Sequence, residues 1–183
     1  MSDDEVFPAD EASTPGDDEA LRGAVVAGAI PGQPPRVLRE AAKYAALLHA
    51  PLVVTHVDVT RFVTYEDPDG FVQTAPIDIH VDVGAEELDA VRQVASEALA
   101  GQKVTWAVRQ LVGDPALALK HFADKIDARL IVVGTRKRGI GDSIREFFTG
   151  SVAARLSHRQ HRSILVVPLG EPLEDDEDWP IEE

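Results

Sequence analysis

Residues 130–168 decide the fold of this chain: LIVVGTRKRGIGDSIREFFTGSVAARLSHRQHRSILVVP. The run Leu130–Val133 is short, apolar and rich in β-branched residues, and Gly134 follows it. Such a run, bounded by turn residues, is typical of a strand buried on both faces. Residues 152 to about 158 have helical spacing, and Ile164–Val167 predicts a second buried strand. The stretch therefore consists of a strand, a basic loop with glycines, a helix and a strand.

A glycine-bearing loop between a strand and the start of a helix suits a bound phosphate. The first backbone N–H groups of a helix have no partner within it, and its N-terminal end carries partial positive charge. A purely structural interpretation stays open beside this one. Gly134 and Gly150 also permit tight turns, and Thr149 or Ser151 also serves as a helix cap.

Strands and helices alternate upstream of this stretch. Apolar runs predict strands at residues 24–30, 52–59 and 104–108, and helical spacing predicts helices over 36–50, 85–100 and 115–126. Asp114 has the position of the N-cap of the last of these helices, with Pro115 in its first turn. The alternation predicts an α/β fold with a parallel sheet of five main strands and right-handed crossovers.

An irregular segment, residues 60–84, interrupts this alternation. The β-prone runs Phe62–Tyr65 and Phe71–Thr74 flank a Pro-Asp-Gly turn within it. This arrangement predicts a β-hairpin inserted between the second strand and the next helix.

The formal charge of −14 is concentrated in two segments. Residues 1–20 and residues 170–183 contain eight acids each and no Lys or Arg, which leaves 18 bases against 16 acids in residues 21–169. We interpret the two segments as acidic disordered tails on either side of one domain. Because the acidic tails repel phosphate and no DNA-binding motif is present, we expect no nucleic-acid partner.

Other features restrict the class of protein further. The chain has no cysteine, which excludes disulfides and thiolate metal sites. The first ten residues lack the basic and apolar regions of a signal peptide, and no apolar run is long enough to span a bilayer. We therefore expect a soluble, cytoplasmic protein.

Three motifs together resemble the universal stress protein (UspA-type) family, over about residues 22–168. They are Val112-Gly113-Asp114-Pro115-Ala116, the run from Leu130 to Arg136, and Gly150-Ser151-Val152 followed by the run from Ser163 to Pro168. The resemblance implies an open five-stranded parallel sheet of order 3-2-1-4-5 with helices on both faces, of the adenine nucleotide α-hydrolase-like type. It also implies a homodimer, often formed through the last strand.

Members of the family divide into those that bind ATP and those that do not, and this chain departs from the ATP-binding pattern. The pattern is glycine, two residues, glycine, nine residues, then glycine with Ser or Thr. Gly134 matches its first position and Gly150-Ser151 its last, but Lys137 takes the place of the second glycine. Fifteen residues separate Gly134 from Gly150, against twelve in the pattern. Gly139 and Gly141 substitute only if the loop takes another path.

The adenine end of the expected site also differs. Binding members usually carry Asp just after the first strand, where this chain has Ala29. Val57 matches a position whose backbone meets the base. The resemblance thus gives a nucleotide site with ATP as the possible ligand, and with Mg²⁺ only together with ATP. The candidate residues are Val57, Gly134, Arg136, Gly139, Gly150, Ser151 and Val152.

Seven bases between residues 136 and 162 stand against two acids, Asp142 and Glu146. These bases are Arg136, Lys137, Arg138, Arg145, Arg155, Arg159 and Arg162. Three interpretations are open: a solvated loop and helix end, a site for a small anion or an acidic protein partner, and a surface covered by one of the chain's own acidic tails.

No arrangement typical of catalysis emerges from the sequence. Ser151 has no His or Lys placed as in a triad, and His158 and His161 lack an acid at metal-ligand spacing. The leading hypothesis is a non-catalytic stress-response module that binds a nucleotide or other anion weakly, or binds a partner protein. The alternative is an ATP-binding switch or slow ATPase that uses Gly134, Gly150 and Ser151.

Overall fold

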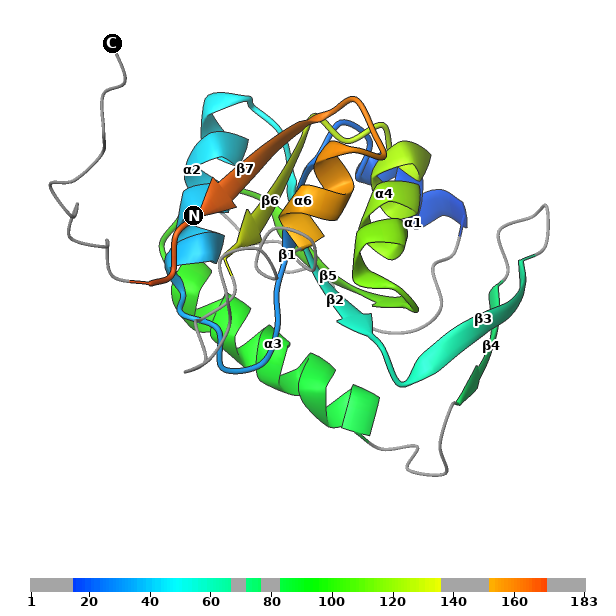
Figure 1. Cartoon of the computed structure of the whole chain (residues 1–183). Helices are drawn as coiled ribbons and strands as arrows, with labels where there is room; N and C mark the ends of the chain where they lie inside the picture. Colours follow the sequence, from blue (N-terminus) through cyan, green and yellow to red (C-terminus); the bar gives the residue numbers. More distant parts are fainter. Residues whose placement is uncertain (1–14, 67–71, 77–82, 136–151, 171–183) are drawn as a thin grey trace, which may run out of the picture.

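The computed structural model describes residues 15–66, 72–76, 83–135 and 152–170 (Figure 1). Its helices are α1 (Pro15–Ala20), α2 (Arg36–Leu47), α3 (Val83–Leu99), α4 (Pro115–Lys125) and α6 (Val152–Ser157). Its strands are β1 (Val25–Gly28), β2 (Leu52–Asp58), β3 (Arg61–Glu66), β4 (Val72–Pro76), β5 (Trp106–Val112), β6 (Leu130–Gly134) and β7 (Ser163–Val167). None of the helices in these ranges is both long and apolar enough to cross a bilayer.

Five parallel strands form the main sheet in the order β5-β2-β1-β6-β7. In terms of the five main strands this is the order 3-2-1-4-5, so the expected fold is confirmed. β1 lies at the centre, where Val25 pairs with Leu52 of β2 on one side and with Leu130 of β6 on the other. The sequence alternates strand and helix, and each helix carries the chain back to start the next parallel strand.

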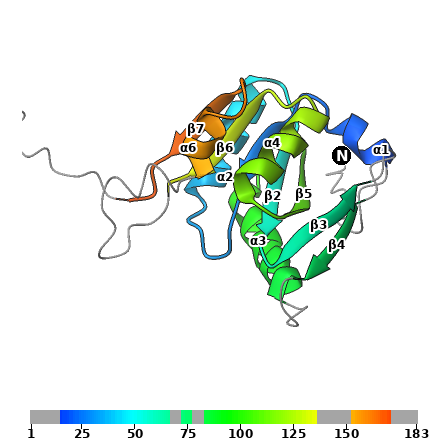
Figure 2. The same cartoon turned by 45° about the vertical axis from the view of Figure 1, so that its right-hand side comes forward.

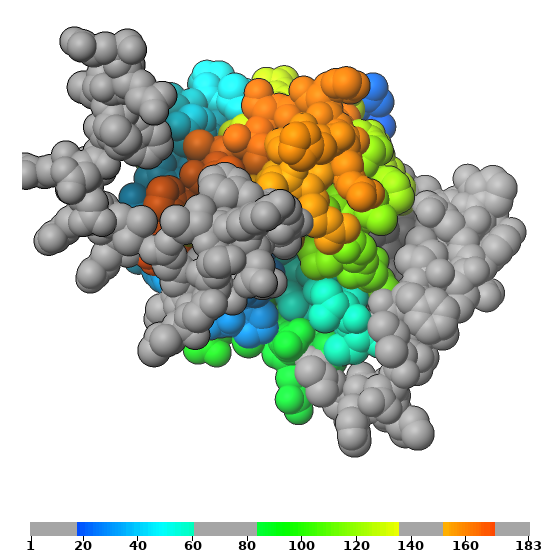
Figure 3. Space-filling model, viewed as in Figure 1, coloured from blue at the N-terminus to red at the C-terminus, as the bar shows by residue number. Residues whose placement is uncertain are grey.

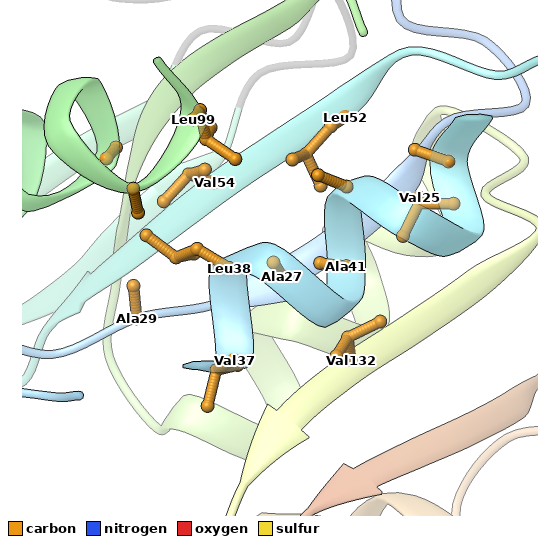
Figure 4. Packing of buried hydrophobic residues seen from close by; sticks show 14 of the residues in the cluster. Val25, Ala27, Ala29, Val37, Leu38, Ala41, Leu52, Val54, Leu99 and Val132 are labelled. Carbon is orange, nitrogen blue, oxygen red and sulfur yellow. The ribbon is translucent and has the colours of Figure 1, made fainter. Parts of the chain in front are cut away.

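The helices cover both faces of this sheet. α2 and α3 pack on one face, around Val25, Leu38, Leu52 and Leu99 (Figure 4). α4 and α6 pack on the other face, where Leu119, Phe122 and Leu156 are buried. Because β1, β2 and β6 are covered on both sides, β1 and β6 consist of apolar residues and glycine, and β2 is apolar over its first three residues.

β7 differs from the strand that the sequence predicts. We expected Ile164–Val167 to be buried, but only Val167 is, and Val166 is 41% exposed. β7 lies at the edge of the sheet and pairs with β6 alone. An apolar run predicts a strand but does not distinguish a central strand from an edge strand, since the missing neighbour is a tertiary feature.

The predicted hairpin is present as a separate two-stranded sheet. β3 and β4 pair antiparallel, with Phe62 opposite Ala75 and an irregularity between Val63 and Tyr65. Figures 1 and 2 both show this hairpin extending away from the main sheet. The Pro-Asp-Gly turn expected at its tip lies outside the described residues.

The segment before β1 also differs in part from the expectation of a disordered tail over residues 1–20. Residues 15–20 form helix α1, and Asp18 Oδ2 lies 2.8 Å from Lys125 Nζ at the end of α4. Leu21 is buried in the core on the α4 side, and Gly23 N donates to Ile126 O at 2.9 Å. One buried leucine and an ion pair therefore hold this segment at the edge where the strands begin.

Candidate functional site

Between the adjacent strands β1 and β6, the connections that follow the two strands lead to opposite faces of the sheet. After β1 the chain crosses to α2 on one face, and after β6 it reaches α6 on the other face. In open α/β sheets, ligands bind outside the carboxyl ends of the strands at such a topological switch point. The residues at this edge are Ala29 after β1, Val57 near the end of β2, and Gly134 with Thr135 at the end of β6.

Three side chains pack closely against Gly134 at this edge. A Cβ at this position would lie 2.8 Å from Leu169 Cδ1 and 3.0 Å from both Gln33 Nε2 and Val37 Cγ2. Real Cβ atoms almost never lie closer than 3.0 Å to another atom, so a side chain at this position would require the end of the Leu169 side chain to shift, with Gln33 and Val37 also closely packed. Close packing therefore favours glycine at position 134 independently of any bound phosphate.

Thr135 fixes the chain that leaves β7. Thr135 N donates to Val167 O at 2.9 Å, and Leu169 N donates to Thr135 Oγ1 at 2.8 Å. The side chain of Leu169 packs against the core on the α2 side. The two parallel strands β6 and β7 thus end side by side, and residues 168–170 stay next to Gly134.

Ala29 and Val57 form the other side of the edge. Ala29 is buried, and its N–H donates to Thr55 O at 2.8 Å. The pairing of β1 with β2 ends at Gly28 and Thr55, so Val57 extends past the end of β1 and is half-buried. As the sequence indicates, position 29 carries the methyl group of an alanine. It has no carboxylate that could accept a hydrogen bond from the amino group of an adenine.

A shallow hollow lies between α2 and α3 next to this edge. Its lining is apolar except for one amide side chain, and consists of Ala29, Ile30, Gln33, Pro34, Leu38, Val91 and Val94. Gln33 Oε1 accepts a hydrogen bond from Ile30 N at 3.0 Å and so closes the turn between β1 and α2. Ile30 at its rim is 64% exposed.

Two buried polar residues in β2 were not singled out from the sequence. His56 is 2% exposed, with Nδ1 3.4 Å from Ala29 O and Nε2 3.3 Å from Glu87 Oε2 of α3. Asp58 is 1% exposed, and its Oδ1 accepts from Thr60 N at 2.8 Å and from Thr60 Oγ1 at 2.6 Å. His56 thus links the end of β2 to Ala29 after β1 and to α3, and Asp58 holds the turn that follows β2. The signal was present, since both interrupt the apolar run of β2.

Asp114 joins α4 to α6, which lie side by side in Figure 3. Its Oδ1 accepts from Leu117 N at 3.0 Å, which confirms the predicted N-cap. Arg155 donates to both carboxylate oxygens, at 2.7 and 2.8 Å. Burial by itself would raise the pKa of Asp114, but the hydrogen bonds from Arg155 and Leu117 outweigh it, and the net effect lowers the pKa.

The basic segment is therefore partly neutralised within the fold. Arg155 pairs with Asp114, and Arg162 pairs with Asp124 and also donates from Nε to Ala128 O at 2.8 Å. These two bases serve to hold α4 against α6 and β7. An external anion could bind Arg155 or Arg162 only by breaking these contacts. Fewer bases are therefore free to form an anion site than the charge count of the sequence indicates.

The remaining predicted site residues fall into two groups. Val152 is the first residue of α6, whereas Arg136, Gly139, Gly150 and Ser151 lie outside the described residues. α6 ends at Ser157, so His158 and His161 lie beyond its end. Within the described ranges, no group of three or more His, Asp or Glu residues is placed to hold a metal ion.

The fold is that of a doubly wound α/β protein, and this edge is its topological switch point. The sequence model of the Universal stress protein family matches residues 25–168 of this chain. The chain therefore belongs to the universal stress protein family, as its motifs indicate. No curated protein matches the chain significantly.

Solved structures of the same family have the same fold. A family member from Burkholderia pseudomallei is 27% identical, with a TM-score of 0.56, and the match covers 81% of this chain and 97% of that chain. A universal stress protein in complex with cAMP is 24% identical, with a TM-score of 0.56 and coverages of 80% and 97%. One from Archaeoglobus fulgidus in complex with dAMP is 22% identical, with a TM-score of 0.52 and coverages of 80% and 98%.

Proposed function

We propose that this protein is a non-catalytic stress-response module that binds an adenine nucleotide, or another small anion, weakly at the carboxyl edge between β1 and β6. The observation that carries the proposal is the arrangement of this edge, where Val57 extends past β1 and Gly134 ends β6 at the switch point. The proposed contacts are Val57, Gly134, Arg136, Gly139, Gly150, Ser151 and Val152. The complexes of related proteins with cAMP and dAMP support an adenine nucleotide as the ligand.

Two features make the proposed binding weak. Ala29 offers no hydrogen-bond acceptor to an adenine amino group, and one such bond contributes about 1 kcal/mol, or about fivefold in the dissociation constant. Lys137 replaces the second glycine of the phosphate-binding pattern, and a side chain at that position of the pattern hinders the close approach of backbone to phosphate that glycine permits. Mg²⁺ enters the proposal only as the counterion of ATP.

The alternative function is an ATP-dependent switch or slow ATPase that uses Gly134, Gly150 and Ser151. The position of Gly134 at the switch point favours an ATP-dependent switch or ATPase as much as it favours nucleotide binding without catalysis. Calorimetric titration with ATP and Mg²⁺, together with an assay of phosphate release, separates the two. Our proposal predicts a dissociation constant of the order of 1 mM, about −4 kcal/mol, and no phosphate release. Micromolar binding with release of phosphate supports the alternative, and no binding at millimolar ATP favours a partner protein over a nucleotide as the ligand.

We further propose that two copies associate in the cytoplasm through β7. This strand has one neighbour in the sheet and exposes Val166, and an unpaired edge strand readily pairs with another chain. Sedimentation of the native protein against Val166→Lys is the test. A dimer that the substitution converts to a monomer supports β7 as the interface. A dimer that survives the substitution contradicts it.

A further inference from the structure

We propose that the side-chain amide of Gln33 is a ligand-binding group at the switch point, where its Nε2 donates a hydrogen bond to a phosphate oxygen of the bound nucleotide. Gln33 belongs to the connection between β1 and α2 and is half-buried. It is not among the contacts that the sequence motifs predict. This role rests on the proposed function, because it adds a residue to the same site.

The orientation of the Gln33 amide is fixed by the backbone of Ile30. Gln33 N donates to Ile30 O at 3.2 Å, and Ile30 N donates to Gln33 Oε1 at 3.0 Å. A backbone N–H group only donates, so it faces the oxygen of the carboxamide and not its nitrogen. The two hydrogen bonds close a tight turn, and Nε2 is left on the side of the carboxamide that does not face Ile30 N.

Gln33 Nε2 lies beside Gly134 at the end of β6. It is 3.0 Å from the point that a Cβ on Gly134 would occupy, and Val37 Cγ2 and Leu169 Cδ1 are 3.0 and 2.8 Å from the same point. The amide nitrogen therefore reaches the carboxyl edge of the sheet between β1 and β6. A phosphate bound next to Gly134 has this donor as a neighbour.

No acceptor within the described residues takes a hydrogen bond from Gln33 Nε2. The atoms of Val37 and Leu169 that lie beside it are carbons. Nε2 is also not sealed from solvent, so water solvates it when no ligand is bound. A donor that is already held in place loses little when a ligand oxygen replaces this water.

The turn by itself does not require an amide at position 33. A glutamate would accept the hydrogen bond from Ile30 N equally well, since only Oε1 takes part in it. Glutamine differs from glutamate in the N–H group that lies beside Gly134. The described fold thus accounts for the oxygen of the Gln33 carboxamide, and the ligand that we propose at this edge accounts for its nitrogen.

The charges near Gln33 favour an anionic acceptor. α2 begins three residues after Gln33, its first turn contains no acid, and its N-cap, Pro35, makes no side-chain hydrogen bond. The start of a helix carries partial positive charge. Arg36 and Arg39, in and next to this turn, are both exposed. A phosphate oxygen suits this surrounding better than a neutral acceptor does.

Two substitutions separate the donor from the turn. Gln33→Glu keeps an oxygen for Ile30 N and removes the donor, whereas Gln33→Met keeps the length of the side chain and removes both polar atoms. The two variants share only the loss of the Nε2 donor. Gln102→Glu is the matched control for charge, because Gln102 is exposed and follows α3 at the opposite edge of the sheet.

The probe is ATP with Mg²⁺ at constant ionic strength, titrated into the full chain and followed at the amides of Val57 and Gly134. We expect the dissociation constant to rise about tenfold in Q33E and about three- to fivefold in Q33M. Both lose a hydrogen bond to a charged group, and Q33E also adds a like charge. Q102E should stay within twofold of wild type. Q33E should unfold within about 2 °C of wild type, and Q33M a few degrees lower, because only Q33M loses the turn bond.

The side-chain signals of Gln33 report on the contact itself. In wild type the two Nε2 protons should shift on addition of ATP, with the same half-saturation as the Gly134 amide. The absence of such a shift, while the Gly134 amide responds, overturns the proposed hydrogen bond.

The outcomes separate the role of Gln33 from the proposed function. Saturable shifts at Val57 and Gly134 with unchanged affinity in both variants leave the proposed function in place and overturn the role of Gln33. A loss in Q33E alone overturns it as well, because a charge acting through space would then be responsible, and a loss in Q33M alone assigns the effect to the turn. An equal loss in both variants overturns a phosphate as the acceptor. No saturable shift in wild type overturns both proposals.

Discussion

Arg155 of α6 donates two hydrogen bonds to the carboxylate of Asp114, which is also the N-cap of α4. One acidic side chain thus starts a helix and ties it to another helix 41 residues further along the chain. The two side chains are 34% and 32% exposed, so solvent limits the strength of the pair without abolishing it.

Asp114→Ala should lower the free energy of unfolding by about 2 kcal/mol, because it removes a cap worth about 1 kcal/mol and the partner of Arg155. Urea unfolding of Asp114→Ala, Arg155→Met and the double variant measures the coupling between the two. We expect the double variant to lose about 1 kcal/mol less than the sum of the single variants. Strict additivity would show that the pair contributes nothing to stability.

The pH dependence of stability should reflect the same carboxylate. The pKa of Asp114 is lowered from 3.8 in the folded protein, and that of Asp124 is lowered by the hydrogen bonds from Lys120 and Arg162. A carboxyl with a lowered folded pKa stabilises the fold above its unfolded value, and this stabilisation is lost as the pH falls through the folded value. Unfolding free energies between pH 6 and pH 2 should therefore fall most steeply below pH 4. Asp114→Asn should make that fall shallower, and an unchanged slope would contradict the assignment.

Gly134→Ala should destabilise the protein by about 1–3 kcal/mol through overpacking. The new Cβ would meet Leu169, Gln33 and Val37 at 2.8–3.0 Å. Gly170→Ala is the matched control, since nothing lies within 4 Å of a Cβ at that position. Thermal unfolding of both variants without ligand is the measurement. Equal stability of the two variants would mean that Gly134 is needed for a ligand rather than for packing.

Gly84→Ala should be destabilising by about 2 kcal/mol or more, because its Cβ would clash with Oδ2 of the buried Asp58. Asp58 cannot turn away without breaking its hydrogen bonds to Thr60. The penalty of Gly84→Ala should be smaller in an Asp58→Ala background, where the clash is absent. Chemical unfolding of the four proteins tests this, and an identical penalty in both backgrounds would rule out the clash as its cause.

The sequence is sufficient to predict most of the fold, because buried parallel strands and amphipathic helices have distinct periodicities. The N-cap at Asp114 and the strand Leu130–Gly134 are local features, and the structure has both. The exposure of β7, in contrast to these local features, depends on how many strands lie beside it in the sheet. Two strands with nearly the same composition, β6 and β7, therefore differ in burial.

The candidate site is less predictable from the sequence than the fold. A count of charges treats Arg155 as part of an anion site, yet its partner Asp114 is 41 residues away in sequence. Gly134 matches a phosphate-binding pattern, yet the packing of Leu169 against it is visible only once β7 is placed beside β6. His56 and Asp58 lie in an apolar run, and their roles depend on Ala29, Glu87 and Thr60, which other segments supply.

The most direct test of the central claim is to map ATP binding by amide chemical shifts in the protein titrated to about 10 mM nucleotide. The account predicts saturable shifts at Ala29, Val57, Gly134 and Val152, with half-saturation of the order of 1 mM and no change at Gly23 and Gly101 on the opposite edge. Shifts confined to other surfaces, or no saturable shift at these four residues, would contradict it.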